Sequence, residues 1–216
     1  MPIYKKVNKN FFKTWSHSMA YVLGFIFADG NIVQTKRNTW FLSIQITDKN
    51  ILLKIKQLLK AQHKISKRKL IKNNKQLYRL QIGSKEICID LMRLEVSPNK
   101  SKVMKFPIIP SVFFPSFLRG YFDGDGHVWV GKNKKVITGF TSGSLGFLQK
   151  LKDALRGRGI KGGSIVSKAR GFCLQYSMID SLKLAEIMYN TDTQKNGLFL
   201  NRKKLIFDKI KRFMQS

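Results

Sequence analysis

Two stretches of the chain, VLGFIFADG at residues 22–30 and LRGYFDGDG at residues 118–126, follow one pattern and begin 96 residues apart. The same offset brings a set of apolar residues into correspondence, Ile51, Leu52, Ile55 and Leu59 with Phe147, Leu148, Leu151 and Leu155. Further along, YRLQI at 78–82 corresponds to FCLQY at 172–176 with the offset shortened by two residues, as a difference in loop length would produce. Self-similarity at a fixed period indicates a repeated structural unit. We therefore interpret the chain as two copies of one unit.

Each copy predicts the order helix, strand, strand, helix, strand, strand, helix. In the first copy, a helix of about ten residues ends at Asp29, and we expect Gly30 to close it with a left-handed turn. The other elements expected in this copy are strands at 31–36 and 39–47, a helix at 48–60, strands at 64–71 and 76–83, and a helix at 85–94. The second copy predicts strands at 127–131 and 136–142, a helix at 144–156, strands at 163–168 and 172–177, and a helix at 179–188, before a last basic helix at 199–213. The expected class is α+β, with half-domains at 1–96 and 117–216 and an extended, proline-rich linker at 97–116.

The charge balance of the chain is strongly basic. Its 216 residues include 41 Lys and Arg against 12 Asp and Glu, a formal net charge of +29, while 43% of the residues are hydrophobic. That hydrophobic share is enough for a packed core and excludes a disordered or low-complexity chain. Excess positive charge opposes the compact state, so we expect a polyanionic partner, with nucleic acid the first choice and an acidic membrane its rival.

Other function classes are disfavoured by the sequence. The longest apolar run, residues 19–28, is too short to cross a bilayer, and the first residues do not resemble a signal peptide. Cys88 and Cys173 are isolated from each other and read as small buried side chains, so neither a zinc site nor a disulfide framework follows. We expect an intracellular protein with no membrane partner.

Small residues recur four positions apart in both motifs, at Gly24 and Ala28 and at Gly120 and Gly124. Residues four apart share a helix face, so the two motif helices can approach each other closely. If they pack side by side in parallel, Asp29 and Asp125 meet at the C-terminal ends of the pair. Two anions at the negative ends of two helix dipoles are unfavourable unless a cation binds there. This arrangement predicts a divalent metal site, and its hard oxygen donors suit Mg²⁺.

The alternative interpretation is that each Asp-Gly only caps a helix and each small-residue pair only serves packing. Repetition in otherwise divergent halves favours the metal site, because capping would accept Asn or Ser as readily. A calcium-binding EF-hand loop at residues 123–126 is excluded, since its other oxygen ligands and its closing Glu are absent.

The two motifs resemble the paired signature of the LAGLIDADG homing endonucleases, and the resemblance extends over nearly the whole chain. It implies that family's fold, two pseudo-symmetric αββαββα half-domains whose two curved antiparallel sheets form a DNA-binding saddle. It also implies double-strand DNA cleavage across the minor groove, with Asp29 and Asp125 binding Mg²⁺, for which Ca²⁺ or Mn²⁺ can substitute. The carbonyl groups of Ala28 and Gly124 are the further ligands that it implies.

The sequence departs from the family pattern at one position. Phe27 stands where the motif has its earlier acid, while Asp123 keeps that acid in the second copy. In the family this position is structural rather than metal-binding, so the departure leaves activity possible and makes the two halves chemically unequal.

Four further catalytic candidates follow from the resemblance. Gln45 and Thr141 stand at equivalent positions near the acids, where the family orders water. Lys100 and Lys203, in the basic segments PNKS at 98–101 and FLNRK at 199–203, match the family's basic residue beside the scissile phosphates, where a fixed cation stabilises developing charge. Ordinary surface charge is the alternative for both lysines.

The strands alternate polar and apolar residues, so one face of each sheet is expected to pack on helices and the other to read DNA in the major groove. The DNA-binding candidates are Lys36, Asn38, Ser43, Lys67, Lys69, Arg79 and Gln81 in the first copy, and His127, Trp129, Lys132, Lys135, Thr138, Lys168, Arg170 and Gln175 in the second. The alternatives for each are a merely solvated side chain or a contact to phosphate, which takes half or more of such contacts.

Three functions are therefore open. The first is a Mg²⁺-dependent, sequence-specific endonuclease that acts as a monomer on duplex DNA, in a bacterial or phage cytoplasm or an organelle matrix. The second is an RNA-binding maturase of the same fold that helps an intron RNA to fold without cutting DNA. The third is a general basic DNA binder, which would bind equally well with chelator and never nick. Retention of both acids favours the enzyme.

Overall fold

The structure is a computed structural model that describes residues 5–69, 76–98, 103–131, 135–190 and 197–215. Its first half contains α1 (His17–Asp29), β1 (Gly30–Gln34), β2 (Trp40–Ile46), α2 (Lys49–Leu58), β3 (Ile65–Lys69), β4 (Gln76–Gly83) and α3 (Lys85–Arg93). Its second half contains the 3-10 turn η2 (Ser111–Phe113), then α4 (Phe114–Asp125), β5 (Gly126–Val130), β6 (Val136–Ser142), α5 (Leu145–Arg156), β7 (Ser164–Lys168), β8 (Gly171–Tyr176), α6 (Met178–Tyr189) and α8 (Asn201–Gln215). The predicted element order is confirmed.

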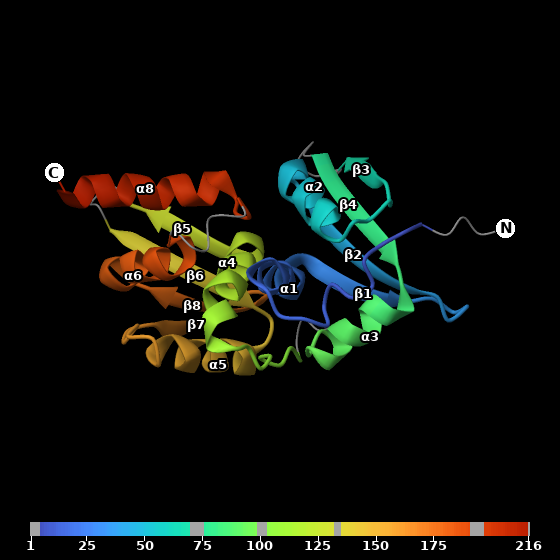
Figure 1. Cartoon of the computed structure of the whole chain (residues 1–216). Coiled ribbons are helices and arrows are strands. Elements are labelled where there is room, and N and C mark those ends of the chain that lie inside the picture. Colours follow the sequence, from blue (N-terminus) through green and yellow to red (C-terminus); the bar gives the residue numbers. More distant parts are fainter. Residues whose placement is uncertain (1–4, 70–75, 99–102, 132–134, 191–196, 216) are drawn as a thin grey trace.

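The strands form two four-stranded sheets of the same topology, β1-β2-β4-β3 and β5-β6-β8-β7, and every neighbouring pair is antiparallel. The two sheets lie on opposite sides of the α1–α4 pair, which occupies the centre of the molecule (Figure 1). This is the predicted α+β fold, two αββαββα halves related by pseudo-symmetry. The antiparallel pairing allows one face of each sheet to pack on helices and the other to meet a partner.

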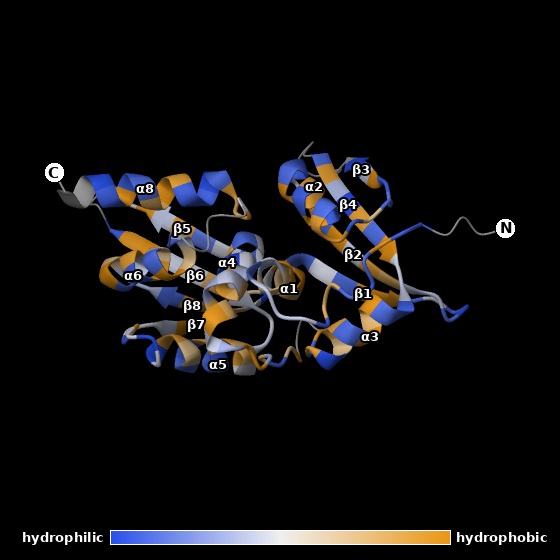
Figure 2. Ribbon diagram, viewed as in Figure 1, coloured by the Kyte–Doolittle hydropathy of each residue, from blue (hydrophilic) through white to orange (hydrophobic). Residues whose placement is uncertain are grey.

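The hydrophobic core is continuous through both halves and centres on α1. Every residue of α1 from Met19 to Phe27 is buried, and Figure 2 shows this helix coloured largely as hydrophobic. Polar caps define where the other helices begin: the side chain of Asp48 accepts from the amides of Asn50 and Ile51, and Ser144 Oγ accepts from the amide of Phe147. Such caps satisfy backbone donors that a helix start leaves without partners.

Two local predictions are wrong. Gly30 and Gly126, which follow the motif helices, are extended (φ −89°, ψ 152° and φ −87°, ψ 157°) rather than left-handed. Glycine is required there by proximity instead, because a Cβ at Gly30 would lie 2.7 Å from the Ile26 carbonyl oxygen and a Cβ at Gly126 would lie 2.5 Å from that of Phe122. The last part of the expected extended linker is helical: η2 begins at Ser111, and α4 then starts with Pro115 in its first turn, a position that tolerates proline.

Candidate metal centre and nucleic-acid interface

The motif helices α1 and α4 touch backbone to backbone. A Cβ added at Gly24 would lie 2.1 Å from the Phe117 carbonyl oxygen, and one added at Gly120 would lie 2.0 Å from that of Tyr21. Both positions therefore exclude any side chain. The next turn repeats the contact, since a Cβ at Gly124 would meet Ala28. The contacts advance in the same direction along both helices, so the predicted parallel pairing is confirmed.

Parallel pairing brings the two acids to one end of the pair. Asp29 and Asp125 are the last residues of α1 and α4, and both are half-buried. Asp29 Oδ2 lies 3.2 Å from the position of a Cβ at Gly124, the residue before Asp125. Glycine at 124 therefore leaves room for the carboxylate of the other half.

The chemistry of this end fits a hard divalent cation. It offers two carboxylates, and the carbonyl groups of Ala28 and Gly124 lie on the adjoining residues of the touching helices. Within the described residues, no group of three or more His, Cys, Asp and Glu side chains forms a metal cluster. A metal here would consequently depend on these two acids, backbone oxygen and solvent, a donor set that suits Mg²⁺ and does not suit Zn²⁺.

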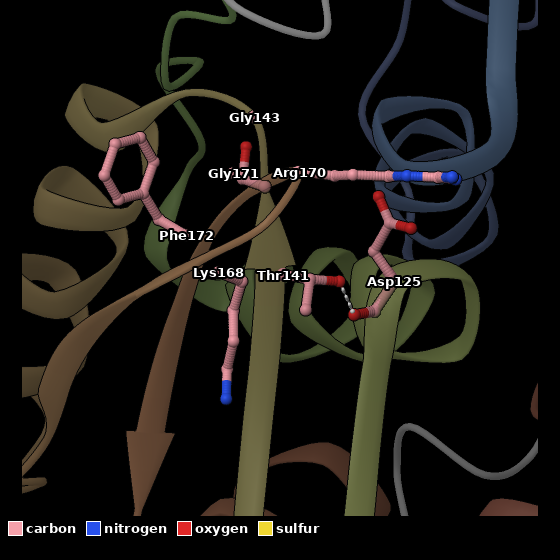
Figure 3. Close-up of a pocket in the computed structure, with 8 residues that line it drawn as sticks. Asp125, Thr141, Gly143, Lys168, Arg170, Gly171 and Phe172 are labelled. Atoms are coloured by element: carbon pink, nitrogen blue, oxygen red, sulfur yellow. Dashed lines mark hydrogen bonds between the residues drawn. The ribbon is translucent and has the colours of Figure 1, made fainter.

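A cavity of about 290 Å³ opens beside Asp125. Its lining residues are Asp125, Thr141, Ser142, Gly143, Lys168, Arg170, Gly171 and Phe172. Thr141 Oγ1 donates a hydrogen bond to the Asp125 carbonyl oxygen at 2.7 Å (Figure 3). Arg170 extends from the β7–β8 turn across the same cavity. The sequence candidates Thr141, Lys168 and Arg170 thus lie together beside one acid.

Gln45 occupies the equivalent place in the first half. It follows Ile44, which pairs with Gly30 in the sheet, so its backbone lies next to the end of α1. Its side chain is partly exposed. Its neighbour across the sheet is Arg79, on β4.

Lys203 is buried, with an exposed fraction of 5%. Its ammonium donates to the carbonyl oxygens of Phe122 (2.6 Å) and Asp123 (2.8 Å), and also to those of Gly124 and Gly126. Burial lowers the pKa of Lys203 to about 8, while the nearby carboxylates, Asp123 first, act in the opposite direction. The alternative interpretation as ordinary surface charge is therefore wrong. Its partners make it the cation at the C-terminal end of α4, where the helix dipole favours positive charge. Lys100 lies outside the described residues.

Asp123, the acid that only the second half retains, lies inside the interface between the helices. It is fully buried, and its Oδ2 accepts from the Tyr21 hydroxyl at 2.7 Å and from the Leu200 amide at 3.0 Å. Its Oδ1 accepts no hydrogen bond within the described part of the chain. Burial raises the pKa of Asp123 to about 6, against the opposing effect of the Tyr21 hydrogen bond. These contacts are structural, as the resemblance implies.

Arg119 adds a second buried charge at the same interface, which the sequence prediction missed. It is 1% exposed, and its guanidinium donates to the carbonyl oxygens of Leu198 and Met188 at 2.8 and 2.7 Å. It therefore ties α4 to the chain segment that precedes α8. An Arg inside a hydrophobic helix motif was the available signal, because Arg is almost never fully buried unless its donors are paired.

Sheet register decides which DNA-binding candidates face outward. Outward positions are those that alternate with the buried, helix-facing residues of each strand. By this rule Ser43, Arg79, Gln81, His127, Trp129, Lys168 and Gln175 face outward, although Ser43 is only 7% exposed. Lys36, Asn38, Lys135 and Arg170 lie in exposed turns or at strand ends.

Two of the candidates do not lie on the outward face of a sheet. Thr138 is fully buried, because it shares the inward face of β6 with Phe140. Lys67 is exposed but pairs with Tyr78, so it lies on the helix side of the edge strand β3. The outward residues of that strand are Ser66 and Arg68, and Arg68 is a further cation that the sequence prediction missed. Lys132 and the side chain of Lys69 lie outside the described residues.

The comparisons with known proteins agree with this architecture. A family profile described as a LAGLIDADG-like domain matches residues 16–92 and 116–187, one segment in each half. The chain belongs to the LAGLIDADG family. No curated protein matches its sequence.

Solved structures with the same fold include the homing endonuclease I-WcaI bound to its DNA recognition sequence. It has a TM-score of 0.60 and 19% identity, over 91% of this chain and 90% of that one. The LAGLIDADG meganuclease I-AabMI bound to uncleaved DNA has a TM-score of 0.58 and 16% identity, over 90% and 89% of the two chains. Full-length DUF199/WhiA from Thermatoga maritima has a TM-score of 0.57 and 16% identity, over 96% of this chain and 65% of that one. At these identities the likeness shows the fold.

Among the described residues, none of the helices combines the length and hydrophobicity that a bilayer crossing requires.

Proposed function

We propose that this chain is a metal-dependent, site-specific DNA endonuclease that acts as a monomer and hydrolyses both strands of a long asymmetric duplex. The observation that carries the proposal is the meeting of Asp29 and Asp125 at one end of a parallel helix pair, with Asp29 Oδ2 against Gly124. I-WcaI and I-AabMI, which share the fold, are bound to DNA. The formal charge of +29 supports the same partner.

In this proposal Asp29 and Asp125 hold Mg²⁺, with the carbonyl groups of Ala28 and Gly124 as further oxygen ligands; Ca²⁺ or Mn²⁺ can take the same donors. Bound there, the metal supplies an activated water and stabilises the leaving oxygen of the phosphodiester. The small residues of the helix pair let the two acids approach. A side chain at position 124 would push the two helices apart and separate the carboxylates of Asp29 and Asp125.

The remaining residues of the metal centre hold its ligands in position or neutralise the charge of the phosphates. Thr141 fixes the Asp125 carbonyl by its hydrogen bond. Lys168 and Arg170 line the same cavity and are exposed, so they supply the cations that meet the phosphates there. Lys203 is buried beneath the site. Its four carbonyl partners support a role in holding the last turn of α4, and with it Asp125, in place. Gln45 is the counterpart of Thr141 in ordering solvent near Asp29.

The proposal is tested by selecting cleaved molecules from a randomised duplex library. The purified chain is incubated with the library in Mg²⁺ or in chelator, and the product ends are sequenced. We expect one family of cut sites that appears only with Mg²⁺. Duplex binding without cleavage in either condition would leave the third function, a general basic DNA binder, as the explanation and refute the enzyme.

A second candidate function, RNA binding without DNA cleavage, is favoured by one observation. Trp129 lies on the outward face of β5 with 52% of its surface exposed. Proteins that recognise unpaired RNA stack its bases on aromatic side chains of this kind. A direct comparison of affinity for duplex DNA and for a structured RNA with unpaired loops separates the two: a preference for the RNA, without any cleavage of the library, would favour the maturase.

A further inference from the structure

A short segment that leads into α8, residues 197–203, contacts both halves of the molecule, and we call it the strap. At its beginning, the carbonyl oxygen of Gly197 accepts a hydrogen bond from Lys54 Nζ of α2, in the first half, at 2.6 Å. The side chains of Leu198 and Leu200 are buried in the hydrophobic core. The strap is therefore a packed part of the fold rather than a loose connection between two helices.

Arg119, on α4, fixes the beginning of the strap. Its Nε donates to the carbonyl oxygen of Leu198 at 2.8 Å, and its Nη1 donates to that of Met188, in the last turn of α6, at 2.7 Å. Its guanidinium carbon lies 5.5 Å from the centre of the Tyr21 ring of α1. One planar fork of donors thus joins α4, α6 and the strap, a geometry that a lysine ammonium does not reproduce.

The rest of the strap returns to the end of α4. The Leu200 amide donates to Asp123 Oδ2 at 3.0 Å. Lys203 Nζ then donates to two carbonyl oxygens in the last turn of α4, at 2.6 and 2.8 Å. The last carbonyl groups of a helix have no amide partner within that helix. The strap therefore supplies donors to the turn that ends at Asp125.

The equivalent positions of α1 carry different residues. Leu23 stands where α4 has Arg119, and Phe27 stands where α4 has Asp123, at the offset of 96 residues that relates the two motifs. Both side chains are buried, and neither can donate or accept a hydrogen bond. The charged contacts with the strap therefore belong to the helix that carries the acid of the second half, and α1 has no residue of the same kind at these two positions.

We propose that Arg119 is a positioning residue for Asp125, a role that rests on the proposed metal-dependent cleavage and extends it. By fixing the beginning of the strap, Arg119 places Lys203 beneath the last turn of α4. That turn sets where the Asp125 carboxylate stands relative to Asp29. Contacts that hold metal ligands from outside contribute about 10–100-fold to metal affinity or activity.

The experiment compares wild type with Arg119→Leu, which places at this position the residue type that the first half has there. Circular dichroism first shows that both proteins are folded at the temperature used. Affinity for Mn²⁺ is then measured without DNA, from the electron paramagnetic resonance signal of the free ion. Single-turnover rates in Mg²⁺ are measured on a selected target whose two strands carry different labels. We expect Mn²⁺ affinity to fall by about tenfold or more, and the ratio of the two strand rates to change by about tenfold, because only one acid is displaced.

The matched control is Leu151→Ala, on α5, a helix that packs on β6 and β8. Leu151 is fully buried, so its truncation lowers the stability of the second half while the hydrogen bonds of the strap are kept. The control is expected to keep the wild-type Mn²⁺ affinity and the wild-type ratio of strand rates. If Arg119→Leu behaved in the same way as this control, Arg119 would have a structural role alone, and the proposal would be overturned.

A milder variant, Arg119→Lys, takes the place of Arg119→Leu if that protein does not fold. It keeps the charge and replaces the rigid fork by a single ammonium, so we expect smaller changes in the same direction. Wild-type values of both quantities would overturn the proposal. A wild-type chain that binds no Mn²⁺ and cuts neither strand would refute the proposed function and this inference with it, whereas intact cleavage with no difference between wild type and the Arg119 variants would refute the inference alone.

Discussion

The two sheets share one topology and differ in what their outward faces offer to DNA. On the first sheet, Gln45, Arg79 and Gln81 alternate with buried residues such as Leu80. These long polar side chains suit hydrogen bonds to base edges, Arg with guanine and Gln with adenine. On the second sheet the outward positions mix the apolar or aromatic residues Trp129, Ile137 and Val166 with the polar residues His127, Lys168 and Gln175.

The halves also differ in buried charge. Phe27 packs on Phe117 and Phe147 at the motif position where the second half has Asp123. The second half buries Asp123 and Lys203 close to Asp125. The difference teaches that pseudo-symmetry is kept where the helices touch and is relaxed in the buried charges and in the outward side chains.

The largest effect is expected for substitutions at the backbone contact between α1 and α4, which both halves share. Gly120→Ala is expected to destabilise the fold by about 3 kcal/mol or more, because its Cβ would lie 2.0 Å from a backbone oxygen of α1 that cannot move aside. Gly24→Ala is expected to cost as much. Chemical denaturation measures both.

Gly146→Ala is the matched control, since a Cβ at that helical position meets nothing within 4 Å. Its stability is expected to stay the same or to rise by up to about 1 kcal/mol through helix propensity. If Gly120→Ala were as stable as this control, the close approach of α1 and α4 would be refuted.

The buried lysine is tested next. Lys203→Ala is expected to lower the free energy of unfolding by about 2–4 kcal/mol, because it leaves buried carbonyl groups without their donor. The adjacent Lys204, which forms a helical ion pair with Asp208 and lies 5.9 Å from the centre of the Phe199 ring, should cost less than about 1 kcal/mol when changed to Ala. Equal effects of the two changes, measured by denaturation, would contradict the role assigned to Lys203.

The raised pKa of Asp123 predicts that the stability of the fold depends on pH. Its pKa is about 6 in the folded chain against an ordinary value of 3.8, so between these values the folded state binds more protons than the unfolded state. Stability from this group is therefore lost as pH rises from 4 to 6, by about 2–3 kcal/mol. Asp123→Asn removes the titrating group.

The stability of the Asp123→Asn variant relative to wild type should accordingly rise by that amount between pH 4 and pH 7. The readout is the free energy of unfolding by denaturant, measured for both proteins at each pH. Parallel curves for the two proteins would mean that Asp123 does not titrate in this range.

The outward faces give the smallest expected effects. Arg79→Ala should weaken binding to a selected target by about 1–3 kcal/mol and relax one position of the half-site read by the first sheet. Trp129→Ala should relax a preference for thymine, whose methyl group accepts apolar contacts, in the other half-site. Repeating the selection of cleaved sites with each variant tests both expectations. If Arg79→Ala relaxed the half-site of the second sheet, or Trp129→Ala that of the first, the assignment of one half-site to each sheet would be contradicted.

The sequence predicted most of the architecture, because the repeat and the strand periodicity are local signals. The parallel helix pair followed from Gly24, Gly120 and their neighbours, since only small residues permit that contact. The sequence placed Lys67 and Thr138 on the outward face because alternation alone does not determine the register of a strand. A shift of one residue moves every side chain to the other face. The pairing of Lys67 with Tyr78 and of Thr138 with Tyr176 places both residues on the helix-facing side of their sheets.

The sequence named the two acids and several of their neighbours as candidates, but it did not predict that Lys203 is buried. Asp29 and Asp125 stand in a motif, whereas Lys203 reaches partners about 80 residues away in sequence, a distance over which no local pattern reports burial. Such contacts appear only when the chain is folded.

The central claim is that two carboxylates, one from each half, act together on a phosphodiester. Single-turnover cleavage of a selected target in Mg²⁺ by wild type, Asp29→Asn and Asp125→Asn tests it most directly, with binding in Ca²⁺ as the control for folding and recognition. Both variants are expected to bind and to leave both strands uncut. Cleavage of both strands at the wild-type rate by either variant would contradict the claim.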